Sequence, residues 1–392
     1  MSKTSEVQPT KEVKEVDYTL KNPDTLTKYK IAGEISTRVL SKVIELATAG
    51  SKIIDICIKG DELLLEETAK VYKGKNVTKG IGFPTSLSVN QVAAHFTPLP
   101  SDPEAAAVIS EGDLLKISLG AQIDGFGAIL GDTIVVGGGA ISGKKADVLM
   151  AAHLASEAAI RLIKPGGRNW DVTDAVQKIA ESFGCKPCEG ILSHSQTRNV
   201  VDGKKEIILN PSENVKRETH LFEEGDVFGV DILVSTGDGK VKKVESRTTV
   251  FKRASDLKYS LKMPTSRRAL SEIDKTFGAF PFTLRALSDK IDEKSARMGV
   301  IEPQKHGLLL AYDVFEAKSD DFVALFHTTI ALGANGTIKL AGPTQFNSSN
   351  CQTDKSLADE DLKALIARPL KATKTKKKKQ NATAATQDEK TQ

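Results

Sequence analysis

Two related segments hold the residues whose types and positions best indicate a chemical site. They are residues 111–120 (EGDLLKISLG) and residues 224–231 (EGDVFGVD), 113 positions apart. In both, an acidic turn leads into an apolar strand with one polar residue at the same place, Ser118 in the first copy and Asp231 in the second. Asp231 offers a carboxylate for metal binding or proton transfer, whereas Ser118 offers only a neutral hydroxyl, which is a poor metal ligand. We expect both side chains to point into one central site of a fold with internal two-fold symmetry.

A second landmark supports this duplication. The spacing Gly50-x4-Asp55 recurs as Gly166-x4-Asp171, 116 residues later. Each glycine ends a helical pattern and each aspartate lies near the start of the next one. Two landmarks with nearly the same offset predict a tandem repeat of helix, helix, strand and strand.

The elements of the repeat follow from hydrophobic periodicity. Ile31, Ile35, Val39 and Val43 recur every four residues, which predicts an amphipathic helix from Asp24 to Gly50. The same reasoning predicts helices at about 55–73, 145–163, 171–183, 266–277, 283–298 and 357–367, a β-like stretch at 81–99, and strands at about 114–123, 132–137, 227–235, 246–252, 309–316 and 321–332.

These elements predict an α+β fold with pseudo-two-fold symmetry and a ligand cleft between its halves. We expect a disordered N-terminal segment (1–22), one large domain (23–355, with pseudo-repeats at about 26–140 and 145–355), a short helix (356–370) and a disordered lysine-rich tail (371–392). The sequence does not fix the oligomeric state, although the fold looks closed enough for a monomer.

Composition excludes several classes of protein. Of 392 residues, 40% are hydrophobic and 27% are charged, which is typical of a soluble globular chain, and no apolar run is long enough to span a membrane. The N-terminus lacks the apolar region of a secretory signal. Four cysteines exclude a disulfide framework, and the Cys185-x-x-Cys188 pair lacks the second pair that a zinc site needs. We expect the cysteines to be structural.

Positive charge is concentrated in two segments. Residues 240–268 contain ten Lys or Arg against two acids, with Phe251 and Tyr259 among them, and residues 371–379 contain six lysines and no acid. Such clusters neutralise phosphates, and nearby aromatic rings stack on unpaired bases, although a solvated surface is the ordinary alternative. The candidate nucleic-acid contacts are Lys240, Lys242, Lys243, Arg247, Lys252, Arg253, Lys258, Lys262, Arg267 and Arg268, and in the tail Lys371, Lys374, Lys376, Lys377, Lys378 and Lys379.

At this point the residues resemble a known family. The order of elements, the segments 93–98 (AAHFTP) and 116–120 (KISLG), and the Ser193-His194-Ser195 turn resemble type II methionine aminopeptidases. The resemblance covers about residues 26–355 and implies the "pita-bread" aminopeptidase fold. The lysine-rich tail and the segment 246–253 (SRTTVFKR) resemble the proliferation-associated, ErbB receptor-binding branch of that superfamily.

The resemblance also implies where the metal ligands of the aminopeptidases would fall. Their two Asp, one His and two Glu correspond to Ser118, Ile129, His194, Asp231 and His327, and their two substrate-handling histidines correspond to His95 and Asp202. Ile129 has no lone pair, and a hydroxyl cannot bridge two ions as a carboxylate does. The chain therefore departs from the family at both aspartates, and we expect no dinuclear metal site, no cofactor and no catalysis.

Two ways of rescuing metal binding remain open. The first is replacement of a lost ligand by Asp124 or Asp132, but strand alternation puts Asp132 on the face opposite to Ile129, and Asp124 lies toward the turn at Gly125. Alternatively, a single zinc ion accepts three histidines and one carboxylate as ligands, and the chain offers His95, His194, His327 and Asp231. The competing interpretation is a hydrogen-bonded polar remnant of an ancestral pocket.

The resemblance implies partners as well. Members of the branch bind ribosomal RNA precursors, large ribosomal subunits, structured RNA or DNA, and move between nucleolus, nucleus and cytoplasm. We therefore expect a non-catalytic protein that binds DNA, including curved DNA, or ribosomal RNA and large subunits, in ribosome biogenesis, translation or transcription control, with no membrane contact. A scaffold that holds a peptide or other protein partner in the cleft without cleaving it is the alternative, and a working metalloaminopeptidase is the less favoured one.

Overall fold

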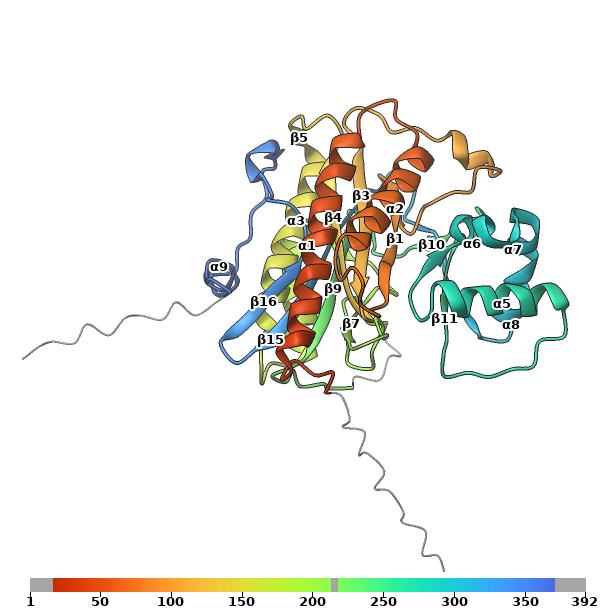
Figure 1. Ribbon diagram of the computed structural model, residues 1–392. Coiled ribbons are helices and arrows are strands. Elements are labelled where there is room, and N and C mark those ends of the chain that lie inside the picture. Colours follow the sequence, from red (N-terminus) through yellow and green to blue (C-terminus); the bar gives the residue numbers. More distant parts are fainter. Residues whose placement is uncertain (1–16, 213–217, 371–392) are drawn as a thin grey trace, which may run out of the picture.

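The computed structural model describes residues 17–212 and 218–370, so the tail lysines and residues 1–16 lie outside the described residues (Figure 1). The helices are α1 (Pro23–Leu46), α2 (Ile53–Ala69), η1 (Pro103–Ala106), α3 (Gly143–Leu162), α4 (Asn169–Ser182), α5 (Pro264–Thr276), α6 (Leu284–Ile291), α7 (Glu293–Gly299), α8 (Ile301–Lys305), η2 (Ser348–Asn350) and α9 (Glu360–Ile366). No helix within the described ranges combines the length and apolar character needed to cross a membrane.

A large sheet forms the centre of the molecule. Its strands run antiparallel in the order β1-β3-β4-β15-β9-β7-β8, with β16 paired to β15 and β6 to β9. These strands are β1 (Lys79–Val89), β3 (Leu114–Ile123), β4 (Phe126–Val135), β6 (Lys186–Pro187), β7 (Leu192–Gln196), β8 (Glu206–Ile208), β9 (Val227–Ser235), β15 (Val323–Gly333) and β16 (Gly336–Ala341).

Smaller sheets surround the large one. β10 (Lys242–Lys243), β14 (Phe315–Glu316) and β2 (Val92–Ala94) form one, β12 (Phe282–Thr283), β11 (Val250–Arg253) and β13 (Leu309–Tyr312) form another, and β17 (Cys351–Gln352) pairs with β5 (Ile141–Ser142). Only one face of the large sheet carries the long helices, because α1 packs on β3 and β4 while α3 packs on β9 and β15. Alternate strand residues bury apolar side chains under these helices, and the next residues face the other side.

The two halves repeat the same hydrogen bonds at their acidic turns. Asp113 accepts from the backbone N–H of Ser110, and Asp226 accepts from that of Glu223. Gly112 and Gly225 both have positive φ, 76° and 94°. Gly112 donates to the carbonyl of Val136, which directly follows β4, and Gly225 donates to that of Leu332 in β15. The matching bonds confirm the pseudo-two-fold symmetry that the repeated sequence predicts.

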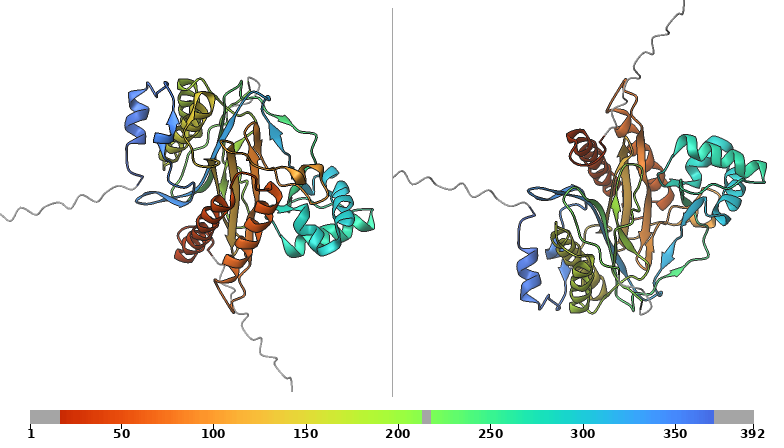
Figure 2. Two further views of the ribbon diagram at one scale, coloured as in Figure 1. Left: turned by 90° about the horizontal axis from the view of Figure 1, so that it is seen from above. Right: turned by 90° about the horizontal axis from the view of Figure 1, so that it is seen from below.

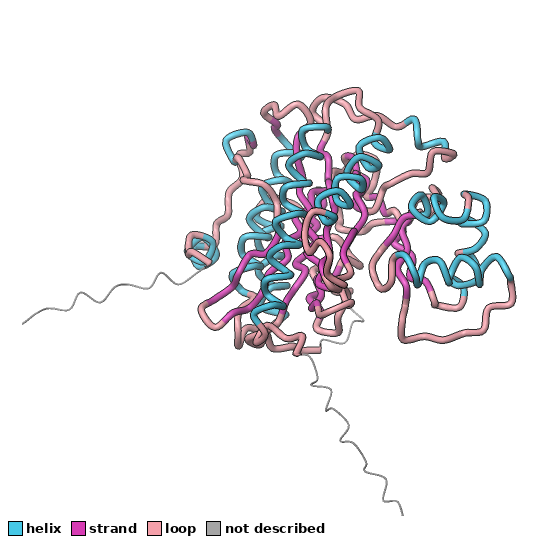
Figure 3. Tube along the Cα trace, viewed as in Figure 1, coloured by secondary structure: helices cyan, strands magenta, loops and turns pink. Residues whose placement is uncertain are grey.

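A helix-rich insert (residues 250–312) stands beside this body. It comprises β11 to β13 with α5 to α8 between them, and it has its own apolar core around Phe251, Phe282 and Leu287. Figure 2 shows the insert on the opposite side of the molecule from α9, and Figure 3 shows its helices separated from the central strands. Arg285 anchors it to the body, since its guanidinium lies 2.7 Å from the half-buried carboxylate of Asp61.

Several predicted elements differ from the structure. The helix predicted at 283–298 is two helices, because Asp292 has a φ of 68° and its carboxylate caps α7 at Ser295. The strand predicted at 309–316 is divided between two sheets, β16 is an additional strand, and His194 lies in β7 rather than in a turn. The expected disorder up to residue 22 is wrong for Asp17 to Asn22, where Asn22 donates to the backbone carbonyl of Asp17 at 2.8 Å and caps α1.

Candidate functional site: a polar cleft with a substituted ligand set

Four neighbouring strands place the candidate residues on the sheet face that α1 and α3 leave uncovered. Ser118 is on β3, Ile129 on β4, Asp231 on β9 and His327 on β15. The residues next to them in sequence, such as Ile117, Leu130 and Val230, are buried in the helix-covered cores. Strand alternation therefore directs the candidate side chains toward one place.

They line a cavity of about 210 Å³. The structure brings together all seven positions predicted from the sequence: His95, Ser118, Ile129, His194, Asp202, Asp231 and His327. Phe83, Tyr312 and Leu325 add apolar walls. Gly229 makes room for the ring of His327, since a Cβ on Gly229 would lie 3.0 Å from Nε2 of His327.

Asp231 and His327 face each other across paired strands. Nδ1 of His327 is 3.7 Å from Oδ1 of Asp231, and neither Oδ1 of Asp231 nor Nε2 of His327 has a hydrogen-bond partner among the described residues. Burial raises the pKa of Asp231 to about 7 and lowers the pKa of His327 to about 4. Near neutral pH, His327 is therefore neutral and Asp231 is partly protonated.

The other two histidines are held by backbone carbonyls. Nδ1 of His95 is 3.0 Å from the carbonyl oxygen of Asp313, and Nδ1 of His194 is 3.2 Å from that of Gly203. The ring of His95 meets the edge of Tyr312 at 5.2 Å, and burial lowers the pKa of His95. Both residues thus present a fixed imidazole to the cavity wall.

Asp202 is engaged by a lysine from the insert. Both carboxylate oxygens lie 2.7 Å from Nζ of Lys252, which is only 7% exposed. The pair joins the loop that follows β7 to strand β11 of the insert. The expectation that Lys252 contacts nucleic acid is therefore wrong, because its charge is buried and neutralised within the fold.

The residues do not fit a dinuclear metal site. At two of the five positions the cavity meets the hydrocarbon of Ile129 and the hydroxyl of Ser118, which cannot supply bridging carboxylates. Within residues 17–212 and 218–370, no three His, Cys, Asp or Glu side chains lie close enough together to hold one metal ion.

Neither aspartate considered as a replacement reaches the cavity. Asp132 lies under the helices and accepts hydrogen bonds from the backbone and hydroxyl of Thr344, while its burial raises its pKa to about 6. Asp124 is at the β3–β4 turn and is paired with Lys28 and Arg198, at 2.7 and 2.8 Å. Both carboxylates therefore have structural roles.

Sequence reasoning missed two polar residues near the cleft. Lys116, on the cavity side of β3, is 1% exposed and donates to the carbonyls of Asn90 at 2.7 Å and Val323 at 3.0 Å. Gln196 lines the cavity, is 4% exposed, and its Oε1 has no hydrogen-bond partner among the described residues. Lys116 lies two residues before Ser118 on the same strand, and this spacing was the sequence signal that placed Lys116 on the cavity side.

The cations and aromatic rings of the basic segment (residues 240–268) lie in different surroundings, some exposed and some held within the fold. Arg253 is held by Asp274 and two backbone carbonyls, Arg247 pairs with Asp102 at 3.0 Å, and Phe251 is buried in the core of the insert. Phe251 therefore does not offer a stacking surface, whereas Tyr259 is 40% exposed and stacks on His306. Lys243 pairs with Asp313 at 2.8 Å, and Arg267 donates to the carbonyls of Leu261 and Lys262. The exposed cations whose side chains have no ion pair or hydrogen bond among the described residues are Lys240, Lys242, Lys258, Lys262 and Arg268.

The four cysteines are free thiols, and Cys57, Cys185 and Cys188 are buried. Burial raises the pKa of the Cys185 and Cys188 thiols to about 12, which keeps both protonated. Their environment is that of packed core residues.

Comparison with known proteins places this cleft in a family. A family model described as metallopeptidase family M24 matches residues 27–250, ending where the insert begins. The chain belongs to metallopeptidase family M24. Its fold is the pita-bread fold shared with solved methionine aminopeptidases, as the sequence predicts.

Relatives within the family share nearly the whole chain. It is 50% identical over 366 residues to the curved DNA-binding protein of Schizosaccharomyces pombe, covering 93% of this chain and 95% of that protein. It is 42% identical over 372 residues to ERBB-3 binding protein 1 of Solanum tuberosum, covering 94% and 92%. A solved structure of a thermophilic Arx1 has a TM-score of 0.85 and 39% identity, covering 90% of this chain and all of that one (100%). The predicted branch of the superfamily is thereby confirmed.

Proposed function

We propose that this M24-family protein is non-catalytic and binds nucleic acid, as DNA or as ribosomal RNA on large ribosomal subunits and their precursors. The observation that carries the loss of catalysis is the pair Ile129 and Ser118 at the cleft surface, where the metal-dependent members need carboxylates. Relatives named for binding curved DNA and ERBB-3 support a binding role.

The insert and the neighbouring strand β10 provide the surface for this role. Lys258, Lys262 and Arg268 are exposed on the insert, and Lys240 and Lys242 are exposed beside it. Exposed cations with nearby apolar groups suit an RNA or DNA surface, because phosphates release counterions and bases cover apolar area. The apolar groups are Leu257, Tyr259, Met263, Met298 and Ile301, all between 40% and 60% exposed.

Contacts of this kind position a protein on a polyanion without specifying its sequence. We therefore propose recognition of charge and shape, with the lysine tail (Lys374 and Lys376 to Lys379) adding affinity from outside the described residues. We further propose that these surfaces take the protein to the nucleus, the nucleolus and the cytoplasm, wherever ribosomal particles occur. We propose that the protein acts as a monomer.

Sedimentation with purified large subunits and electrophoretic shift of curved duplex DNA, each across a salt series, test the proposal. One full-length variant carries Lys242→Glu, Lys258→Glu, Lys262→Glu and Arg268→Glu, and a second has the six lysines of residues 371–379 (Lys371, Lys374 and Lys376 to Lys379) changed to Gln. Each lost phosphate contact should lower the slope of log affinity against log salt by about one.

The matched control reverses four exposed lysines at the helical layer: Lys30, Lys73, Lys164 and Lys178. Loss of binding in the first variant, with the control unchanged, supports the insert surface. Equal loss of binding in the first variant and in the control would show a generic effect of net charge. Unchanged co-sedimentation of the first variant would refute the insert surface as the binding site.

A second function is favoured by the unpartnered polar atoms of the cleft. Oδ1 of Asp231 and Nε2 of His327 line a cavity flanked by His95 and His194. Such atoms suit a peptide end that is held without cleavage. Binding of a labelled methionyl peptide, abolished by joint replacement of His95 and His194 with Ala, would support this role, and binding that survives the replacement would remove it.

A further inference from the structure

A separate groove of about 1160 Å³ lies at the end of the sheet where the described chain begins. Its walls are residues 18–21, the first turns of α1, the loop after β7, the second acidic turn and the β15–β16 hairpin. Its floor is a small apolar core that includes Tyr29, Val227 and Leu340. The volume exceeds the range of about 300–1,000 Å³ typical of small-molecule pockets, so the groove suits an extended chain.

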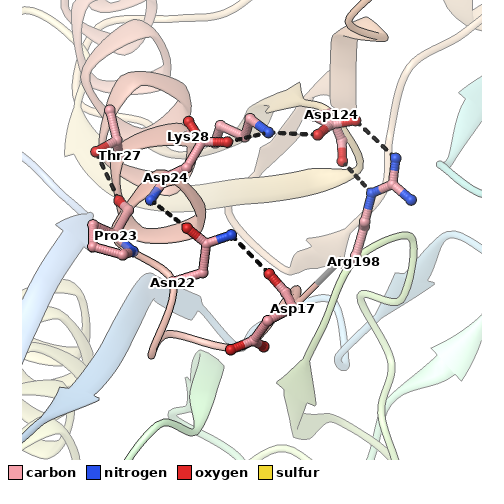
Figure 4. Close-up of polar contacts among 8 residues, drawn as sticks. All are labelled: Asp17, Asn22, Pro23, Asp24, Thr27, Lys28, Asp124 and Arg198. Atoms are coloured by element: carbon pink, nitrogen blue, oxygen red, sulfur yellow. Dashed lines mark hydrogen bonds and ion pairs between the residues drawn. The ribbon is translucent and has the colours of Figure 1, made fainter. Parts of the chain in front are cut away.

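The wall formed by residues 17–22 is fixed by hydrogen bonds and ion pairs (Figure 4). Asn22 joins Asp17 to the start of α1, donating to the backbone carbonyl of Asp17 at 2.8 Å and capping Asp24 at 3.0 Å. Asp124 forms ion pairs with Lys28 from α1 and with Arg198 from the loop after β7. The guanidinium carbon of Arg198 lies 4.2 Å from the centre of the Tyr18 ring. The groove is therefore built into the fold.

Two buried polar groups that line the groove have no hydrogen-bond partner among the described residues. The hydroxyl of Tyr29 belongs to a side chain that is 1% exposed, and Oε1 of Gln196 belongs to one that is 4% exposed. A buried polar atom without a partner costs free energy, so an occupant that supplies a donor to Gln196 is favoured. Backbone N–H groups of an extended peptide are such donors.

The charge around the groove has the opposite sign to that of the whole chain. The groove and its edge carry the cations Lys21, Lys28, Arg198 and Lys205 and the anions Asp17, Asp24, Asp124, Glu223, Glu224 and Asp226, whereas the chain has a net charge of +4. Glu224 is exposed and has no ion pair within the described chain. An acidic edge repels phosphates and attracts lysine or arginine side chains.

We propose that this groove binds an extended segment of a partner protein in which apolar side chains alternate with lysine or arginine. The apolar side chains cover the floor at Tyr29 and Val227, the cations meet the edge at Glu224, and the backbone donates to Gln196. The inference is independent of the nucleic-acid surface, which lies on the insert and has the opposite charge.

Fluorescence anisotropy of the full-length protein with a labelled, acetylated octapeptide of alternating Leu and Lys provides the test. Octapeptides alternating Leu with Glu and Ser with Lys are the comparison probes. We expect the Leu–Lys probe to bind best, and Glu224→Lys to weaken it about fivefold or more, since an exposed ion pair becomes a repulsion.

Glu111→Lys is the matched control, because Glu111 is exposed at the equivalent position of the first acidic turn, away from the groove. Tyr29→Phe should leave both folding stability and binding of the probe intact, because the hydroxyl has no partner among the described residues and the probe covers the ring with apolar side chains. Equal binding of all three probes, or equal effects of Glu224→Lys and Glu111→Lys, would overturn the proposal. Tighter binding after the six tail lysines are changed to Gln would overturn it too, by showing that the chain's own tail is the occupant.

Discussion

His327 and Asp231 are directly paired across the antiparallel strands β15 and β9, with Nδ1 and Oδ1 3.7 Å apart. In this arrangement burial makes ionisation of either side chain unfavourable, and each retains one polar atom with no partner in the described chain. In an enzyme with the full ligand set, a bound metal ion would be the partner of both polar atoms. With Ile129 and Ser118 beside them, the two side chains form a polar cavity wall instead.

The pH dependence of the free energy of unfolding should reveal the ionisation of the Asp231 carboxyl group. Its pKa of about 7 in the folded chain lies above the ordinary value of 3.8, so its stabilising contribution is present below pH 3.8 and is lost as the pH rises to about 7. The Asp231→Asn variant lacks this titration. The difference between the two urea-derived free energies of unfolding should therefore change between pH 4 and 7, and a difference independent of pH would contradict the assignment.

Restoring the two carboxylates should restore metal binding. The variant Ser118→Asp with Ile129→Asp should be less stable than the native chain without metal, because it buries charges near Asp231. Co²⁺ at 100 times its Kd should then stabilise the variant by about 2.7 kcal/mol, while the native chain shows no shift in Tm. Equal stabilisation of both proteins by Co²⁺ in differential scanning calorimetry would contradict the substituted-site interpretation.

The pair formed by the buried Lys252 and the half-buried Asp202 should act as one unit. Lys252→Met leaves the Asp202 carboxylate without its cation, and we expect a loss of about 1.5–3 kcal/mol in the free energy of unfolding. The double variant Lys252→Met with Asp202→Leu should recover part of that loss, since neither charge is left unpaired. Strictly additive losses in urea denaturation would show that the two residues do not interact. Lys258→Met, at an exposed position of the same insert, is the control.

Ionisation of Lys116 should make the free energy of unfolding depend on pH in a second, separate range. Burial lowers its pKa from 10.5 to about 7, so its stabilising contribution is complete above pH 10.5 and is lost as the pH falls to about 7. Replacing it with Met should remove this slope between pH 7 and 10.5. Denaturation at several pH values in that window compares the two chains, and parallel curves would show that Lys116 titrates normally.

The main features of the fold were accessible from the sequence because they depend on local patterns. The duplicated acidic turns at Asp113 and Asp226, and the four-residue spacing from Ile31 to Val43, determine which elements form and how the halves match. The lining of the cleft by Ser118, Ile129 and Asp231 follows from strand alternation combined with the family resemblance. These predictions required no knowledge of distant contacts.

The misassigned residues are those whose roles depend on partners far away in the sequence. Lys252 looks like its exposed neighbours until Asp202, 50 residues earlier, is seen to bind it. Phe251 lies in a basic segment but packs in the core of the insert. The break at Asp292 depends on a positive φ that the helical periodicity of residues 283–298 does not reveal. Counts of charge and periodicity contain no information about burial by remote segments.

The ion pairs that join the insert to the body have a mechanical consequence. Arg285 with Asp61 and Lys252 with Asp202 connect the two parts at two separate points. Two separate attachments restrict rotation of the insert as well as its translation. We therefore expect the insert to hold whatever it contacts at a constant distance and orientation from the cleft.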